Sequence, residues 1–139
     1  MRTLRATAHV DGASRGNPGP AACAVILSVE GFPSREIGVY LGETTNNVAE
    51  YCGLILALRE ARAEGVTDLT VISDSQLMVS QVNGEFKVSA EKLVPLHQKV
   101  MHLKGGFASF AMRYVPRAEN ARADKLTGRV LKLVEDIGT

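Results

Sequence analysis

Four acidic residues occupy positions in this sequence where solvated charge does not usually collect. Asp11 closes an alternating segment, Asp74 ends an apolar one, and Glu50 and Asp124 fall near the starts of two segments with helical periodicity. Carboxylates that converge in a fold are costly unless cations lie between them. Mg²⁺ suits such a place, because it binds few protein carboxylates and completes its shell with water and phosphate oxygens. If the fold brings the four acids together, they indicate metal-assisted chemistry on a phosphate group.

Each acid also has a purely structural interpretation, which taken singly is at least as good. Glu50 can stabilise a helix N-terminus through the macrodipole, and Asp11 can form a turn before Gly12. Asp74 can cap the segment that follows it, and Asp124 can be a surface acid. The catalytic interpretation therefore depends on where the surrounding elements place all four.

The elements that must position these acids follow from hydrophobic periodicity and turn signals. Asn46 and Asn47 offer an N-cap, and the glycine- and proline-rich segment 12–20 is expected to be a turn. The apolar strand 69–74 follows a helix, so a right-handed crossover places it parallel to the first strand and makes Asp11 and Asp74 neighbours. An α/β fold with one mixed sheet flanked by helices results. Its predicted order is three strands (4–11, 21–29, 35–43), a helix (47–64), a strand (69–74), two helices (75–82, 91–104), a strand (107–115) and a last helix (120–135).

Length and composition place the chain among globular proteins. We expect residues 1–139 to form a single domain, because 139 residues suit one core and 45% of them are hydrophobic against 22% charged. No run reaches the roughly 18 apolar residues of a membrane span, and residues 1–10 lack a secretory signal. A cytoplasmic monomer without membrane contact is therefore expected. Cys23 and Cys52 are expected to be reduced core thiols, since two cysteines cannot form a disulfide framework.

The net charge of +1 conceals an asymmetry along the chain. Residues 1–80 carry 6 Lys and Arg against 9 Asp and Glu, whereas residues 81–139 carry 10 against 6. Cations bound by the acids of the first part would raise the functional charge further. The modest net charge therefore does not exclude a nucleic-acid partner.

Four segments carry the four acids in a recognisable context: VDGASRGNPGPAACAVIL, TTNNVAEYCGLILAL, VISDSQLMVSQVNGEF and VPRAENARADKL. In this order and spacing they resemble the catalytic core of ribonuclease H type 1 over almost the whole chain. The resemblance implies a ribonuclease H-like fold, in which a five-stranded mixed sheet of order 3-2-1-4-5 is flanked by helices. It also implies that Asp11, Glu50, Asp74 and Asp124 bind two Mg²⁺ ions with the substrate, with Mn²⁺ as a substitute. The implied activity is endonucleolytic cleavage of the RNA strand of an RNA–DNA hybrid, leaving 3′-hydroxyl and 5′-phosphate ends.

The resemblance further implies which residues hold the substrate. Only the 2′-hydroxyl separates RNA from DNA at a given position, so small polar groups and main-chain amides are the expected readers. Thr45 would touch a phosphate of the DNA strand. The residues along the minor groove of the hybrid would be Gly12, Ser14, Asn17, Asn46, Asn47 and Gln76. Turn and cap chemistry explains several of these residues in any protein, and that alternative stays open.

Departures from the family pattern predict weak substrate binding. The basic, tryptophan-containing handle that many members carry after the third acid is missing, since GEFKVSAEKLVPL passes straight on and the chain has no Trp. Glu43 and Ala90 replace polar groups that are common in the DNA-phosphate pocket. A lysine-bearing helix is more often a solvated face, but it still offers phosphate contacts through Lys87, Lys92, Lys99 and Lys104.

The loop before the fourth acid is short and lacks the histidine that helps product release in many bacterial members. Arg117, seven residues before Asp124, is its nearest substitute and resembles the arginine of compact archaeal members. It is a candidate catalytic residue that positions the scissile phosphate or assists release. The alternative is an ordinary surface arginine that pairs with Glu119 or faces solvent.

Rival functions fit less well. A nucleotide-cofactor domain needs GxGxxG or GxxxxGK[ST] between a strand and a helix, whereas the glycines here lead into a second strand. A non-catalytic hybrid-binding domain would not need four acids that repel phosphate. Other nucleases of the same superfamily, such as resolvases, exonucleases or enzymes for double-stranded RNA, stay open as alternatives, although the TTNNxxE and DSQ contexts favour ribonuclease H.

Overall fold

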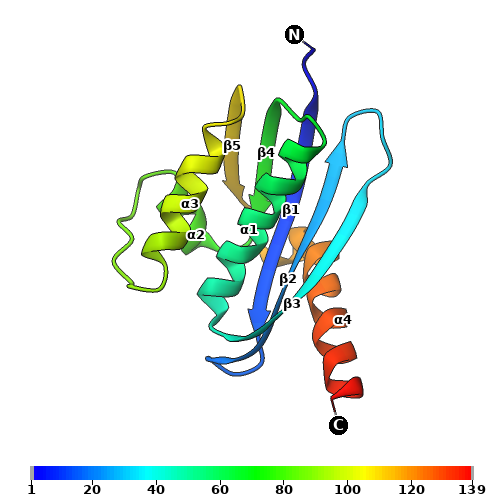
Figure 1. Ribbon diagram of the computed structural model, residues 1–139, viewed down its shortest axis with the longest axis vertical. Helices are drawn as coiled ribbons and strands as arrows, with labels where there is room; N and C mark the ends of the chain where they lie inside the picture. Colours follow the sequence, from blue (N-terminus) through cyan, green and yellow to red (C-terminus); the bar gives the residue numbers. More distant parts are fainter. Residues whose placement is uncertain (1, 139) are drawn as a thin grey trace.

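A computed structural model describes residues 2–138 as one five-stranded sheet with helices on both faces (Figure 1). The strands are β1 (Arg5–Ser14), β2 (Gly19–Val29), β3 (Arg35–Thr44), β4 (Asp68–Ser73) and β5 (Ser109–Tyr114). The helices are α1 (Asn46–Ala63), α2 (Gln76–Val82), α3 (Val94–Lys104) and α4 (Ala121–Ile137), with a 3-10 turn at Arg117–Asn120 before α4. The order of strands and α-helices is the one that the sequence predicts.

The sheet has the strand order β3-β2-β1-β4-β5, which confirms the expected 3-2-1-4-5 topology. β1, β2 and β3 pair antiparallel as a meander, whereas β4 pairs parallel with β1. β5 extends the sheet in parallel with β4. Because α1 supplies the crossover between β3 and β4, the central strands β1 and β4 end at the same edge of the sheet.

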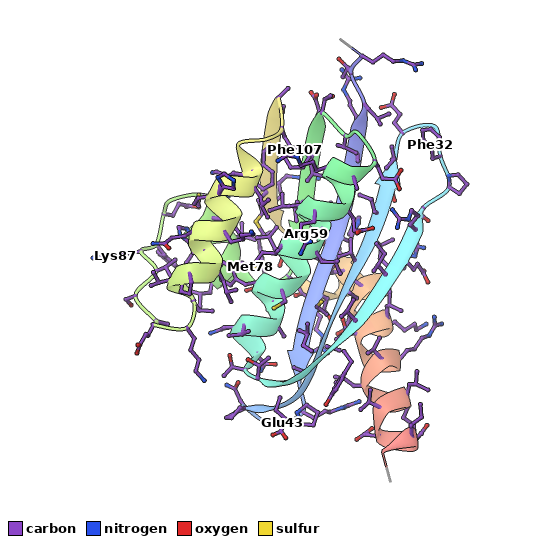
Figure 2. The ribbon with its side chains drawn as sticks, in the orientation of Figure 1. Phe32, Glu43, Arg59, Met78, Lys87 and Phe107 are labelled. Atoms are coloured by element: carbon purple, nitrogen blue, oxygen red, sulfur yellow. The ribbon has the colours of Figure 1, made fainter. Side chains whose placement is uncertain are left out.

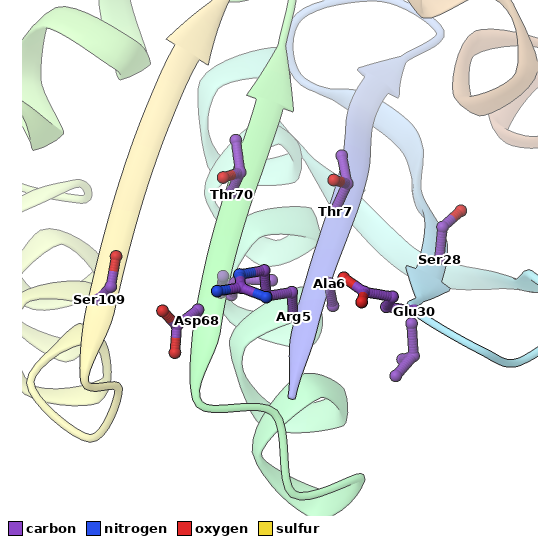
Figure 3. Close-up of a pocket in the computed structure, with 10 residues that line it drawn as sticks. Arg5, Ala6, Thr7, Ser28, Glu30, Asp68, Thr70 and Ser109 are labelled. Carbon is purple, nitrogen blue, oxygen red and sulfur yellow. The ribbon is translucent and has the colours of Figure 1, made fainter. Parts of the chain in front are cut away.

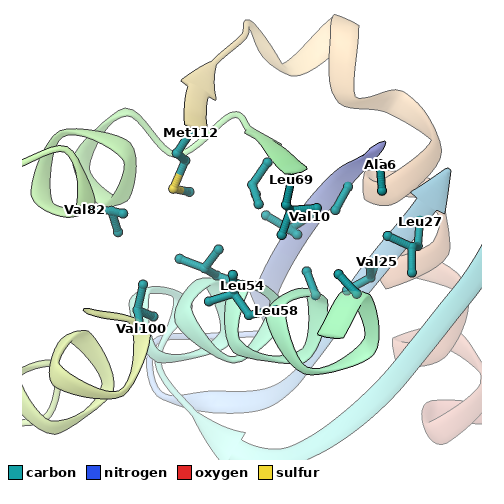
Figure 4. Packing of buried hydrophobic residues seen from close by; sticks show 14 of the residues in the cluster. Ala6, Val10, Val25, Leu27, Leu54, Leu58, Leu69, Val82, Val100 and Met112 are labelled. Atoms are coloured by element: carbon teal, nitrogen blue, oxygen red, sulfur yellow. The ribbon is translucent and has the colours of Figure 1, made fainter. Parts of the chain in front are cut away.

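The main core lies between the sheet and α1, with residues of α2 and α3 completing it (Figure 4). Val10 of β1 and Leu54 of α1 are fully buried, and Leu58 of α1 is almost fully buried on the same side. The buried face of α1 also carries a small residue at every fourth position: Ala49, Gly53, Ala57 and Ala61. Small residues at this spacing form one stripe along a helix, so α1 can approach the sheet closely. Within residues 2–138, no helix combines the length and the apolar character that crossing a membrane requires.

α4 packs on the opposite face of the sheet, across β2, β3 and β1 (Figure 1). A Cβ at Gly38 would lie 2.7 Å from Cγ2 of Val130, so glycine there lets α4 lie close to β3. Helix α4 does not cover the part of this face where β1 and β4 begin. Figure 3 shows a polar hollow there, lined by Arg5, Thr7 and Asp68. Because α4 covers only part of this face, its first residues lie beside the end of β1.

One local prediction is wrong at a place that matters for the site. The segment 12–20, predicted as a turn, instead continues both strands, since β1 runs to Ser14 and β2 begins at Gly19. Only residues 15–18 form the turn. The remaining strand and helix bounds differ from the predicted ones by at most three residues. The longer β1 means that Asp11 lies within a strand, where it pairs with Ala24 of β2.

Candidate active site

Asp11 and Asp74 come from neighbouring parallel strands, and the register of β1 and β4 brings them level. His9 pairs with Ile72, and each acid lies two residues farther along the chain. Asp11 is 4% exposed, whereas Asp74 follows the last residue of β4 and is half-buried. The crossover predicted from the sequence is what brings these two carboxylates together.

Glu50 reaches the same place because α1 passes very close to β1. A Cβ on Gly12 would overlap the backbone of Ala49 and Glu50. A Cβ on Gly53 would lie 2.8 Å from the carbonyl oxygen of Asp11. Glycine is therefore needed at both contacts. Glu50 begins the second turn of α1 rather than lying in the first, and this close approach, not a favourable macrodipole, explains its position.

The carboxylates of Asp11, Glu50 and Asp74 converge, with one oxygen of each within 4.8 Å of the others. Oδ2 of Asp11 and Oε2 of Glu50 are buried and have no hydrogen-bond partner among the described residues. Buried charged oxygens without partners are costly, and an all-oxygen donor set fits a hard divalent cation. Among residues 2–138, no other group of three or more His, Cys, Asp or Glu side chains is arranged in this way.

Burial and mutual repulsion raise the pKa values of all three acids. Burial raises the pKa of Glu50 to about 9, and the charges of Asp11 and Asp74 add to the rise. Burial likewise raises the pKa of Asp11 to about 6, with repulsion from Asp74 and Asp124 contributing. The pKa of Asp74 is also raised, first by burial and then by repulsion from Asp124. Such carboxylates release their protons when a cation binds, because only the ionised form is a ligand.

Asp124 lies in the first turn of α4 and lines the same cleft, but it does not join the group of three. Its Oδ1 lies 3.2 Å from Nη2 of Arg117 in the 3-10 turn. The charge of Asp124 and the hydrogen bond to it raise the pKa of Arg117. Arg117 therefore faces the fourth acid at the mouth of the cleft and does not pair with Glu119.

The cleft around the acids has a volume of about 360 Å³. Gly12, Asn46 and Asn47 line it together with the four acids and Arg117. The predicted substrate residues thus include three that share the cleft with the candidate metal ligands.

Ser14, Asn17 and Asn46 form a hydrogen-bonded link between the β1–β2 turn and the start of α1. The backbone amide of Ser14 donates to Oδ1 of Asn46 at 2.8 Å, and the Ser14 hydroxyl lies 3.2 Å from the same oxygen. The backbone amide of Asn46 donates to Oδ1 of Asn17 at 3.0 Å. These contacts fix the turn against α1, so the three polar residues are held in a defined arrangement beside the cleft.

Thr45 and Gln76 stand at the starts of two helices at the rim. Oγ1 of Thr45 accepts a hydrogen bond of 3.3 Å from the backbone amide three residues on, so Thr45 is the N-cap of α1. The predicted cap at Asn46 or Asn47 is wrong. Gln76 is the exposed first residue of α2 and follows Ser75, which lines the cleft.

The two residues that depart from the family pattern and the four lysines that could contact phosphate lie outside the cleft. Glu43 is exposed near the end of β3, and Lys87 is exposed in the segment between α2 and α3 (Figure 2). Lys104 lies 5.8 Å from the ring centroid of Phe110, which makes it a cation–π partner within the fold. Also exposed are Ala90, Lys92 and Lys99.

Two residues that position the site are not predicted from the sequence. The first is Gly53, whose only signal is the stripe of small residues on α1. The second is Asn120, which is 1% exposed and donates from Nδ2 to the carbonyl oxygen of Val10 at 2.8 Å. That bond ties the start of α4 to β1 next to Asp11. Nothing in the sequence around Asn120 signals so distant a partner.

Comparisons with known proteins add to this geometry. The family model described as reverse transcriptase-like matches residues 9–130. The ribonuclease HI of Halobacterium salinarum is 41% identical over 128 residues, which cover 91% of this chain and 64% of that protein. A bifunctional protein of Mycobacterium tuberculosis is 38% identical over 125 residues, which cover 88% of this chain and 34% of that protein. The chain thus spans less than two thirds of the length of either relative.

Solved structures agree with the same assignment of the fold. The N-terminal ribonuclease H domain of the M. tuberculosis protein superposes with a TM-score of 0.92 at 34% identity, covering 99% of this chain and 100% of that one. LC11-RNase H1 in complex with an RNA/DNA hybrid superposes with a TM-score of 0.83 at 37% identity, covering 89% of this chain and 94% of that one. Both structures therefore share the fold of this chain together with more than a third of the aligned sequence.

Proposed function

The chain belongs to the ribonuclease H type 1 family, and from that membership we propose that it is an endonuclease that hydrolyses the RNA strand of RNA–DNA hybrids. The products would carry 3′-hydroxyl and 5′-phosphate ends. The observation that carries the proposal is the convergence of Asp11, Glu50 and Asp74 within 4.8 Å, with two buried oxygens that lack partners. A relative of the same fold binds an RNA/DNA hybrid, which supports the substrate class.

The residues of the cleft fit two divalent cations, with Mg²⁺ as the proposed cofactor and Mn²⁺ as its substitute. Asp11, Glu50, Asp74 and Asp124 would hold them, since all four offer carboxylate oxygens. When bound, a pair of such ions activates a water and stabilises the leaving oxygen of an in-line displacement. Asp11 lies inside β1 and pairs with Ala24 of β2, so its backbone is fixed by the sheet.

Arg117 is proposed to act on the phosphate rather than on a metal. Its guanidinium lies at the mouth of the cleft beside Asp124 and is 79% exposed. A planar guanidinium can donate two hydrogen bonds to one phosphate group. If Asp124 held a cation, Arg117 would be free to position the scissile phosphate or to assist release of the product.

The minor groove of the hybrid would lie over the link between the β1–β2 turn and α1. Gly12, Asn46 and Asn47 all line the cleft. Amide side chains can both donate to and accept from a 2′-hydroxyl, which is the group that distinguishes RNA. Ser14, Asn17 and Gln76 extend the same contact, and Thr45 would meet a phosphate of the DNA strand.

A passive hybrid-binding domain is the main competing proposal, and the electrostatics disfavour it. Three clustered acids, one buried and two half-buried, repel phosphate unless a cation neutralises them, so they would weaken a site that only binds. All the acids of the cleft come from one chain, so we propose a single domain that acts as a monomer. The expected location of this monomer is the cytoplasm.

The direct test is cleavage of an end-labelled RNA–DNA hybrid with Mg²⁺, with Mn²⁺ and with EDTA. Single-stranded RNA, duplex DNA and duplex RNA serve as controls, and analysis of the product ends tests the chemistry. We expect metal-dependent cleavage of the hybrid alone. Glu50→Gln should abolish it, whereas Glu43→Gln, at an exposed glutamate outside the cleft, should not. Binding of the hybrid without cleavage in either metal would refute the proposal, and preferential cleavage of duplex RNA or DNA would assign another nuclease of the superfamily.

A further inference from the structure

The exposed face of α4 carries a stripe of cations that the proposed chemistry does not use. Lys125, Arg129 and Lys132 follow one another at spacings of four and three residues, so they lie on one side of the helix. Arg15 in the β1–β2 turn lines the same groove, which has a volume of about 650 Å³. Gly128 sits in the middle of the stripe, and a Cβ built there would meet no atom within 4 Å, so the surface is open.

This groove is continuous with the candidate active site. Ala13, Arg117 and Asp124 line both the cleft around the acids and the groove along α4. The groove therefore leads away from the reacting centre along α4. In Figure 1, α4 runs from the middle of the molecule to the C-terminal end, beyond the sheet. From Lys125 to Lys132 the helix rises by about 10 Å.

Most of these cations have no acidic partner within the described residues. Arg15, Lys125 and Arg129 form no ion pair there, whereas Lys132 pairs with Asp136 at 2.8 Å. The acids that line the groove are Asp124 and Asp136, against five basic residues. Neighbouring like charges cost free energy in the free protein, so a row of cations with few acidic partners favours an anionic partner.

We propose that the groove along α4 binds the sugar–phosphate backbone of a nucleic-acid strand as it leaves the cleft. The inference rests on the proposed function, which supplies the strand, and adds a second contact surface to it. Phosphates follow one another at about 3.4 Å along the axis of each strand, so a stripe of about 10 Å can meet about three of them. Such a contact would compensate for the binding affinity lost with the missing basic handle on the other side of the cleft.

The contact is electrostatic and independent of sequence. Lysine and arginine bind phosphates while counterions are released, so log K falls with log salt by roughly 0.9 for each phosphate neutralised. Besides its charged residues, the groove is lined by apolar side chains such as Leu131 and Leu133, which offer no hydrogen bonds for reading bases. The groove should therefore affect affinity and its salt dependence, with little effect on the chemical step.

The test measures hybrid binding by fluorescence anisotropy over a range of salt concentrations in the presence of Mg²⁺. Asp74→Asn is the common background, so that the substrate stays intact. The probe variant is Arg129→Ala with Lys132→Ala. The matched control is Arg5→Ala with Arg59→Ala, which removes the same charge from exposed positions, one at the start of β1 and one on α1 across the sheet (Figures 2 and 3).

We expect the probe variant to raise Kd for a hybrid of about 20 base pairs by roughly tenfold or more, and to reduce the salt slope by about two. The control should change Kd by less than about twofold. Thermal melting of both variants should match the background, since all four side chains are exposed. An unchanged Kd in the probe variant, or an equal loss in the control, would overturn the proposal.

Cleavage by the wild-type chain separates this inference from the proposed function. If the wild type cleaves hybrid and the probe variant binds normally, the groove proposal fails and the nuclease proposal stands. If the wild type does not cleave but the probe variant still loses affinity, the nuclease proposal fails and the groove remains a nucleic-acid surface.

Discussion

Replacing Glu50 by glutamine should stabilise the protein in the absence of metal, although it removes a proposed ligand. Burial raises the pKa of Glu50 to about 9 from an ordinary value of 4.5. The folded chain therefore binds a proton at neutral pH that the unfolded chain does not bind. An acid whose pKa is raised on folding lowers the free energy of unfolding as pH rises, from its unfolded pKa up to its folded one. Glutamine mimics the protonated carboxyl and abolishes this dependence.

The size of the effect follows from the interval between the two pKa values. Each pH unit within that interval costs about 1.4 kcal/mol, so Glu50 destabilises the fold by about 3 kcal/mol at pH 7 and by under about 1 kcal/mol at pH 5. For a chain of this length, about 1 kcal/mol corresponds to roughly 4 °C in Tm. Glu50→Gln should therefore raise Tm by about 10 °C at pH 7, with a much smaller rise at pH 5.

Thermal melts in EDTA between pH 5 and 8 test this directly. The matched control is Glu43→Gln, which neutralises an exposed glutamate near the end of β3. Adding Mg²⁺ should raise Tm of the wild type and raise it less in Glu50→Gln, because a ligand that binds only the folded state stabilises it by mass action. A lower Tm in Glu50→Gln, or the same gain at pH 5 as at pH 8, would refute the electrostatic account of this site.

The remaining predictions concern turnover, binding and packing. Asp74→Asn should reduce kcat by several orders of magnitude with no loss of Tm, as checked by single-turnover cleavage and melting. Lys87→Ala or Lys92→Ala should raise KM and lower the salt slope by about one, and an unchanged slope in both would make them solvated surface residues. Arg117→Ala should lower kcat by less than an acid replacement does and leave KM nearly unchanged, whereas a wild-type kcat would refute its role. Gly53→Ala should cost about 1–3 kcal/mol in stability and weaken Mg²⁺ binding in calorimetry, since its Cβ meets the carbonyl oxygen of Asp11 at 2.8 Å.

Much of the fold could be predicted because local and global signals agree. The alternation before Asp11 and the apolar run before Asp74 define the two central strands, and the intervening helix leaves only the right-handed crossover. That topology alone sets the two acids level. The segment after Asp11 was predicted less well, because its glycines and prolines read as a turn. Gly12 instead lies in a strand that passes under α1, and no local signal separates this use of glycine from its use in a turn.

The sequence singles out Asp11, Glu50 and Asp74, which the structure brings together, but the distance between them could not be predicted. A carboxylate becomes a metal ligand only when its position is fixed to within a fraction of an ångström. Here the position of Glu50 depends on two glycines. Because Gly12 and Gly53 have no side chains, α1 packs directly against β1, which brings Glu50 close to Asp11. This close packing also buries the carboxylates of Asp11 and Glu50 and raises their pKa values. The packing that builds the site therefore makes the ionised carboxylates unfavourable without a cation. A search for chemically reactive residues overlooks such glycines, because they contribute only by having no side chain that would prevent the close packing.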